Sequence, residues 1–173
     1  MEIVTQDKTE TKPPQTSHKK FLILQSILRI LCFASTLIAI WVMATSKQTK
    51  VIYGFAITAK YSYSSALKYF IVAKAIASVL SVVSLVIVLL SITHPEKYFV
   101  LFLMDFISTL LTATGFTAAS TIGFLGMNGD DHIGWMPICN HFDVFCKRSQ
   151  NSVIFSGLAT ILFLILTVWS KRI

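Results

Sequence analysis

Two charged residues lie inside long apolar stretches of the chain. Arg29 is the one charge within residues 21–44, and Asp105 is the one charge within residues 98–125. A charge near the centre of a lipid bilayer costs about 2.5–3.5 kcal/mol on the insertion scale, so such charges are rare and usually paired. The two residues therefore predict a membrane protein that keeps an ion pair, or another polar site, within its lipid-embedded part.

The spacing along the chain puts the two charges at similar depths. Arg29 lies nine residues after Lys20, and Asp105 lies eight residues after Lys97, which corresponds to roughly 14 and 12 Å at the rise of an α-helix. The first and third of four spans run in the same direction, so an Arg29–Asp105 ion pair is geometrically allowed. The alternative is that the two charges serve transport, in a small carrier or channel.

The elements that must position these residues follow from hydropathy. The 173-residue chain has a mean hydropathy of +0.70 and 13% charged residues, about half the usual share. Four apolar runs approach or exceed the roughly 20 helical residues needed to cross a bilayer, over residues 21–44, 69–92, 98–125 and 153–169. We predict an all-α bundle of four transmembrane helices over residues 21–170, between a tail over 1–20 and a short C-terminus over 171–173.

Basic residues at the ends of the chain predict that both termini face the cytoplasm. Lys19 and Lys20 precede the first span, which is expected to be a retained signal anchor, and Lys171 and Arg172 follow the last one. Lysine and arginine next to membrane spans favour the cytoplasmic side. The remaining cations are nearly balanced between the two sides, so they add little to this orientation.

A loop expected over residues 126–151 carries two cysteines, Cys139 and Cys146. Two cysteines in one short polar loop predict a disulfide, which requires an oxidising compartment outside the cytoplasm. His132 and His141 lie in the same loop, so a metal site with the two cysteines is the alternative, although the spacing matches no recognised zinc pattern. The third cysteine, Cys32, is expected to be a small packing residue.

Small and polar residues recur at helical spacing in the predicted spans. Membrane helices pack through such residues, because close backbone approach and interhelical hydrogen bonds replace the missing hydrophobic force. We therefore predict helix contacts along a small-residue ladder in the third span, Gly115, Ala119 and Gly123. We predict similar faces through Gln25, Arg29, Cys32 and Thr36, through Ala73, Ala77 and Ser81, and through Asp105, Ser108, Thr112 and Gly115. Lys74 is expected to extend its ammonium outward to the interface.

The sequence lacks the motifs of the common catalytic and nucleotide-binding sites. It contains no glycine-rich phosphate loop, no HExxH and no GxSxG. Asp130-Asp131-His132 is the nearest approach to a site, and it is expected to form a solvated turn after Asn128-Gly129. The cations form no basic stripe interleaved with aromatic residues. We therefore predict no enzyme, no cofactor, no metal and no nucleic-acid partner.

Nearly the whole chain after the tail over residues 1–20 resembles the CASP-like proteins of plants. These are relatives of the Casparian strip membrane domain proteins and similar to the MARVEL group. Arg29 and Asp105 look like the hallmark charges of that family. Residues 61–76 look like its entry to the second span. Residues 135–139 (Trp-Met-Pro-Ile-Cys), followed by Phe142, Phe145 and Cys146, look like its second outer loop. The resemblance is closest to subgroup 1.

This resemblance implies a multi-pass plasma-membrane protein that associates with itself and with related family members. It also implies a scaffold that organises a membrane domain, with cell-wall-modifying enzymes as further partners. The residues and the resemblance together predict a non-enzymatic, self-associating scaffold, and the carrier or channel remains the alternative.

Overall fold

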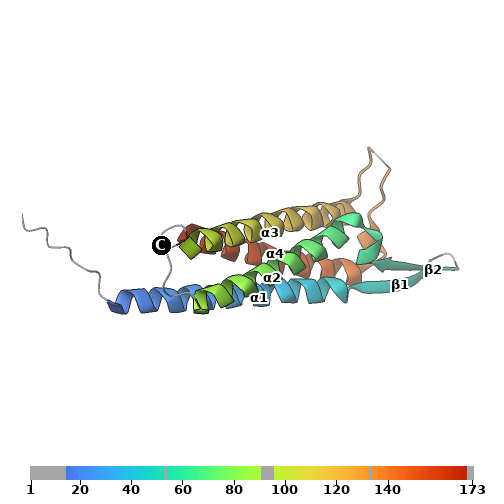
Figure 1. Cartoon of the computed structure of the whole chain (residues 1–173). Coiled ribbons are helices and arrows are strands. Elements are labelled where there is room, and N and C mark those ends of the chain that lie inside the picture. The colour runs from blue at the N-terminus through green and yellow to red at the C-terminus, as the bar shows by residue number, and fades with distance from the viewer. Residues whose placement is uncertain (1–14, 53, 91–95, 133, 171–173) are drawn as a thin grey trace, which may run out of the picture.

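Four long helices dominate the computed structural model, which describes residues 15–52, 54–90, 96–132 and 134–170. They are α1 (Gln15–Ala44), α2 (Ser65–Leu90), α3 (Glu96–Asn128) and α4 (Asp143–Ser170), shown in Figure 1. Each contains a stretch long and apolar enough to cross a membrane. The predicted all-α bundle of four potential spans is therefore confirmed, whereas most of the predicted tail and the C-terminus, residues 1–14 and 171–173, lie outside the described residues.

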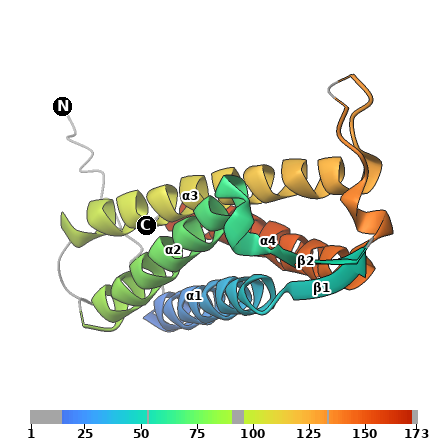
Figure 2. The same cartoon turned by 90° about the vertical axis from the view of Figure 1, so that its right-hand side faces the viewer.

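The helices form a ring in which each packs against two others, in the order α1–α2–α3–α4. The start of α1 and the end of α4 lie at one end of the bundle (Figures 1 and 2). At the other end lie the connection between α1 and α2 and the connection between α3 and α4. We call this second end the hairpin end, after the β-hairpin described below.

The bundle has a polar and small-residue interior and an apolar exterior. Buried polar positions include Gln25, Thr36, Ser84, Ser108 and Thr112, while large apolar side chains such as Trp41, Val79, Leu89 and Ile154 are exposed. A helix in lipid gains nothing by hiding leucine or valine from its surroundings, so its buried face goes to groups that hydrogen bond or allow close approach. This distribution is what a lipid-embedded bundle requires.

The hairpin end contains structure that long apolar runs do not reveal. Strands β1 (Lys47–Ile52) and β2 (Phe55–Lys60) pair antiparallel, with Lys47 opposite Lys60, and a short 3-10 helix, Tyr61–Tyr63, leads into α2. Helix α4 begins at Asp143, ten residues before the predicted apolar run. The prediction missed its first turns because they are polar. The connection predicted over residues 126–151 is therefore shorter, 129–142, and includes a 3-10 helix, Ile138–Asn140.

Hydrogen bonds hold the β-hairpin against the start of α4. The amide of Phe145 donates to Oε1 of Gln48 at 2.9 Å, and the hydroxyl of Ser46 donates to the carbonyl of Phe145 at 3.3 Å. Lys50 lies 3.6 Å from the carboxylate of Asp143. These contacts join residues nearly one hundred positions apart, so the two connections at the hairpin end form one structural unit.

The connection between α3 and α4 is closed by a turn and by a disulfide. Gly129 adopts a φ of +70°, and a Cβ there would lie 2.5 Å from the carbonyl oxygen of Trp135, so only glycine fits. Asp130 and Trp135 exchange backbone hydrogen bonds of 2.8 and 2.9 Å. The structure joins Cys139 and Cys146 as a disulfide, with Cα atoms 5.7 Å apart.

The small-residue ladder of α3 divides between two environments. A Cβ on Gly115 would meet Cβ of Ala73 at 3.6 Å and Cα of Phe70 at 3.7 Å, and Ala119 is fully buried in the cluster around Phe70. A Cβ on Gly123 would meet nothing within 4 Å. The inner part of the ladder therefore packs α3 against α2 within the chain, and Gly123 is left open.

We expect Gly115→Leu to destabilise the bundle by about 1–3 kcal/mol, the usual cost of overpacking, because the added side chain must displace Phe70 and Ala73. Gly123→Leu is the matched control and should change stability by no more than about 0.5 kcal/mol. Thermal unfolding of both variants in the same detergent measures the difference. Equal losses would contradict the packing of Gly115 against α2.

Candidate functional site

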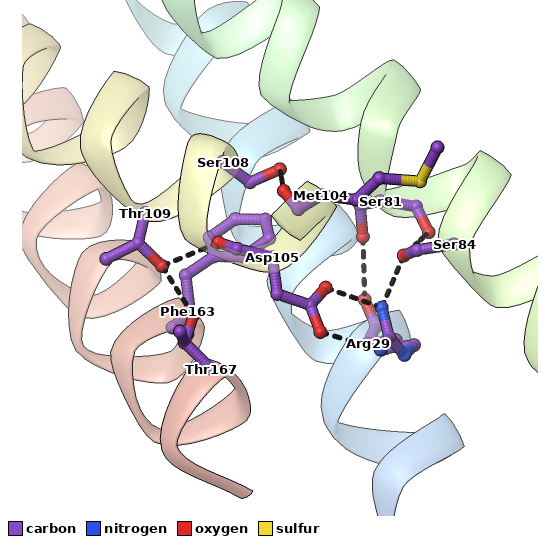
Figure 3. A network of polar contacts seen from close by, with 9 residues as sticks. All are labelled: Arg29, Ser81, Ser84, Met104, Asp105, Ser108, Thr109, Phe163 and Thr167. Carbon is purple, nitrogen blue, oxygen red and sulfur yellow. Dashed lines mark hydrogen bonds and ion pairs between the residues drawn. The ribbon is translucent and has the colours of Figure 1, made fainter. Parts of the chain in front are cut away.

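The two charges singled out in the sequence meet in the bundle interior. The guanidinium of Arg29 donates from Nη1 to Oδ1 of Asp105 at 2.7 Å and from Nη2 to Oδ2 at 2.8 Å (Figure 3). This is the bidentate arrangement in which a planar guanidinium matches both oxygens of a carboxylate. The structure thus brings Arg29 of α1 and Asp105 of α3 into direct contact.

Helix α2 joins the same network through two serines. Nη1 of Arg29 also donates to the hydroxyl of Ser84, and that hydroxyl donates to the carbonyl of Ser81 at 2.9 Å. The hydroxyl of Ser81 in turn donates to the backbone carbonyl of Arg29 at 3.5 Å. One guanidinium therefore links three helices.

Helix α4 contacts the network through threonines. The hydroxyls of Thr109 and Thr167 lie 2.9 Å apart, and Thr109 donates to the backbone carbonyl of Asp105 at 2.8 Å. Figure 3 shows these two residues on the far side of Asp105 from Arg29. Polar contacts thus connect all four helices at the depth of the ion pair.

The ion pair is closed to its surroundings. The Arg29 side chain is 0% exposed and that of Asp105 is 2% exposed. Both carboxylate oxygens accept a hydrogen bond, and Nε of Arg29 is the donor left without an acceptor in the described part of the chain. A carboxylate paired with a guanidinium through both oxygens and buried in this way is suited to hold helices together, because it is not exposed to a substrate.

Lys74 departs from the sequence expectation, which was wrong. Its side chain does not extend outward but is fully buried between α2 and α4. The ammonium donates to the carbonyl of Ser156 at 3.4 Å and lies 5.8 Å from the ring centroid of Phe70. The signal was available, since Lys74 shares a helix face with Phe70, Ala77 and Ser81, three and four residues apart, all of which are buried.

No carboxylate lies within ion-pair distance of Lys74 among the residues that the structure describes. The hydroxyl oxygen of Ser156 is also buried without a partner. This cation therefore relies on one long hydrogen bond and an aromatic ring, a much poorer set of partners than Arg29 has.

The remaining candidates lie elsewhere. Cys32 is fully buried and packs with Phe163 and Leu166. In the described residues, no group of three or more His, Cys, Asp or Glu is arranged to hold a metal ion. Of the alternative metal ligands, both cysteines belong to the disulfide, and His132 lies 3.7 Å from Asp130 at the surface.

Comparison with known proteins connects this geometry to a family. The model of the Casparian strip membrane protein domain matches residues 18–162. The chain is 45% identical to CASP-like protein 1F1 of Vitis vinifera, over 95% of this chain and 82% of the relative. It is 43% identical to CASP-like protein 1F1 of Ricinus communis, over 92% and 90%, and 40% identical to CASP-like protein 1F2 of Populus trichocarpa, over 94% and 92%. No solved structure matches the chain.

We expect Arg29→Leu or Asp105→Leu alone to cost about 3–5 kcal/mol of stability, because each leaves a charge buried without its partner. The double leucine variant should recover much of the loss, since no charge then remains. Folded yield and thermal unfolding in detergent measure the three variants against the parent chain. Losses that simply add would contradict the coupling of the two residues.

We expect Lys74→Met to raise the stability of the bundle, by up to about 2.5–3.5 kcal/mol, the cost of a lysine in a lipid-embedded helix. Methionine fills a similar length and needs no hydrogen bond. Lys68→Met is the matched control, because Lys68 is exposed on the same helix and should change stability little. A clear loss of stability in Lys74→Met would show that the ammonium has a partner of its own.

Proposed function

The chain belongs to the Casparian strip membrane protein family, and on this premise we propose that it is a non-enzymatic, self-associating scaffold of the plasma membrane. The observation that carries the proposal is the closed Arg29–Asp105 ion pair. A carrier or channel based on these charges needs access for water or substrate. Both side chains are instead buried, and both carboxylate oxygens are occupied by the guanidinium.

The distribution of structure along the molecule supports the same proposal. The helices account for most of the described residues, and the parts that project from them are the β-hairpin and the connection over residues 129–142, at the same end. These projecting parts carry exposed apolar side chains, among them Phe55, Trp135 and Met136. Exposed apolar side chains that gather at one end of a molecule favour contact with other proteins.

The β-hairpin offers the more regular of these surfaces. Side chains alternate between the two faces of a strand, so Phe55 and Ile57 lie on one face, and Val51, opposite Ala56, lies on the other. Phe55 is 76% exposed and Ile57 is 47% exposed. Gln48 and Lys50 lie on the same face as Ile57 and contact the start of α4. We assign self-association, and association with related family members, to the exposed part of this face, Phe55 and Ile57.

The proposed orientation places the hairpin end outside the cell and both termini in the cytoplasm. The disulfide between Cys139 and Cys146 suits an oxidising exterior, and the basic residues before α1 suit the cytoplasm. With this orientation, the hairpin end faces the cell wall, where cell-wall-modifying proteins are the further partners that a scaffold of this family would organise.

Energy transfer between two differently tagged copies tests the proposal. With donor and acceptor on the cytoplasmic termini, transfer should clearly exceed that between the chain and an unrelated four-span protein. Surface expression is matched through an epitope at Gly134, which has open space around it and should be labelled on intact cells. Transfer no higher than the unrelated pair would remove the scaffold proposal and favour the carrier.

We expect Phe55→Ser combined with Ile57→Ser to reduce this energy transfer at least twofold, because the substitutions remove the apolar face. Val51→Ser is the matched control, since Val51 is 72% exposed but lies on the opposite face. It should leave the transfer unchanged. Equal effects of the two changes would assign self-association to another surface.

A further inference from the structure

A groove separates α3 from α4 at the hairpin end, with a volume of about 720 Å³. It is lined almost entirely by apolar side chains of the two helices and of the connection between them, including Phe116, Met127, Trp135, Ile154 and Ile161. Small-molecule sites have volumes of about 300–1,000 Å³ and mostly apolar linings with a few polar groups. The groove therefore has the size and character of a ligand site, and its walls are two helices that can span a membrane.

One missing side chain widens this groove. Gly123, Gly126 and Gly157 all line it. A Cβ on Gly123 would meet nothing within 4 Å, whereas the ring of Phe116 already lies 3.1 Å from the Cβ position of Gly157. Gly126 approaches the sulfur of Cys139, which would lie 3.5 Å from an added Cβ. The disulfide thus forms part of the groove wall near the end where α3 and α4 are connected.

The length of the groove matches one leaflet of a bilayer. Its lining on α3 runs from Phe116 to Met127, eleven helical steps or roughly 16 Å, and its lining on α4 runs from Phe145 to Ile161, sixteen steps or roughly 24 Å. One leaflet is roughly 15 Å thick in its hydrocarbon part and about 20 Å thick with its headgroups. A lipid chain that enters at the hairpin end would therefore reach the other end of the groove at about the bilayer midplane.

Polar groups stand at the end of the groove where a headgroup would lie. Gln150 lines it, and Lys147 is exposed three residues earlier on α4. Positions three apart lie on the same helix face, so Lys147 stands beyond Gln150 at the mouth of the groove. No carboxylate is among the lining residues. A cation and an amide above an apolar groove complement a phosphate above hydrocarbon.

We propose that the groove between α3 and α4 binds a glycerophospholipid, with its acyl chains between the helices and its phosphate at Lys147 and Gln150. In this arrangement, the lipid occupies the leaflet at the hairpin end. It fills the open space beside Gly123, where a side chain is missing.

The test uses the full chain in nanodiscs that contain phosphatidylglycerol with a photoreactive group in its acyl chain. Peptides from residues 116–127 and 146–161 should be labelled at least fivefold more than peptides from α1 and from the part of α2 that follows Leu67, because Leu67 itself lines the groove. Gly123→Trp fills the groove and should reduce this labelling about tenfold. Val79→Trp, on the exposed surface of α2, is the matched control and should leave it unchanged. Uniform labelling of all four helices would overturn the proposal.

Lys147→Glu tests the headgroup separately, because an exposed lysine can be replaced without disturbing the packing. Native mass spectrometry should show at least fivefold less retained phosphatidylglycerol than in the parent chain, and unchanged retention would overturn the assignment. A photoreactive sterol that labels the groove while the phospholipid does not would also overturn it. So would efficient cross-linking of two copies through Gly123→Cys, because the groove would then belong to a protein contact.

Discussion

A charge in hydrocarbon must have a partner, and the fold of this protein depends on how that requirement is met. Arginine cannot lose its proton at any ordinary pH, so a lipid-embedded Arg29 is tolerable only beside Asp105. The bidentate contact fixes α1 against α3, and the hydroxyl of Ser84 adds α2. Hydrophobic burial cannot supply this specificity in lipid, because the exterior of the bundle is as apolar as its surroundings. The polar interior therefore determines which helices are neighbours.

Properties that depend only on the position of a residue along the chain could be predicted from the sequence. The length of each apolar run predicts a helix, and the helical rise predicts the depth of a residue. Depth and direction together made an Arg29–Asp105 contact allowable, and the structure places the two side chains 2.7 Å apart. Helix periodicity likewise predicted the buried face through Gln25, Cys32 and Thr36. These inferences needed no knowledge of how the helices are arranged around one another.

Properties that depend on contacts between residues distant in sequence could not be predicted from the sequence. The helix face of Lys74 indicated that it is buried, but the group that its ammonium contacts, the carbonyl of Ser156, is 82 residues away and could not be predicted. The ladder of Gly115, Ala119 and Gly123 has one spacing but two environments, because α2 covers only its inner part. The β-hairpin and the first turns of α4 were not predicted from apolar runs, because neither is a long apolar run, and they stabilise one another through Gln48 and Phe145.

Because the two charges are far apart along the chain, they are synthesised at different times. Asp105 follows Arg29 by 76 residues, and a ribosome adds about 5–20 residues per second. The arginine is therefore made roughly 4–15 s before its counter-ion. During that interval the first helix carries an uncompensated cation, which makes its transfer into lipid less favourable by about 2.5–3.5 kcal/mol. The order of translation thus leaves α1 less stable in the bilayer until α3 has been made.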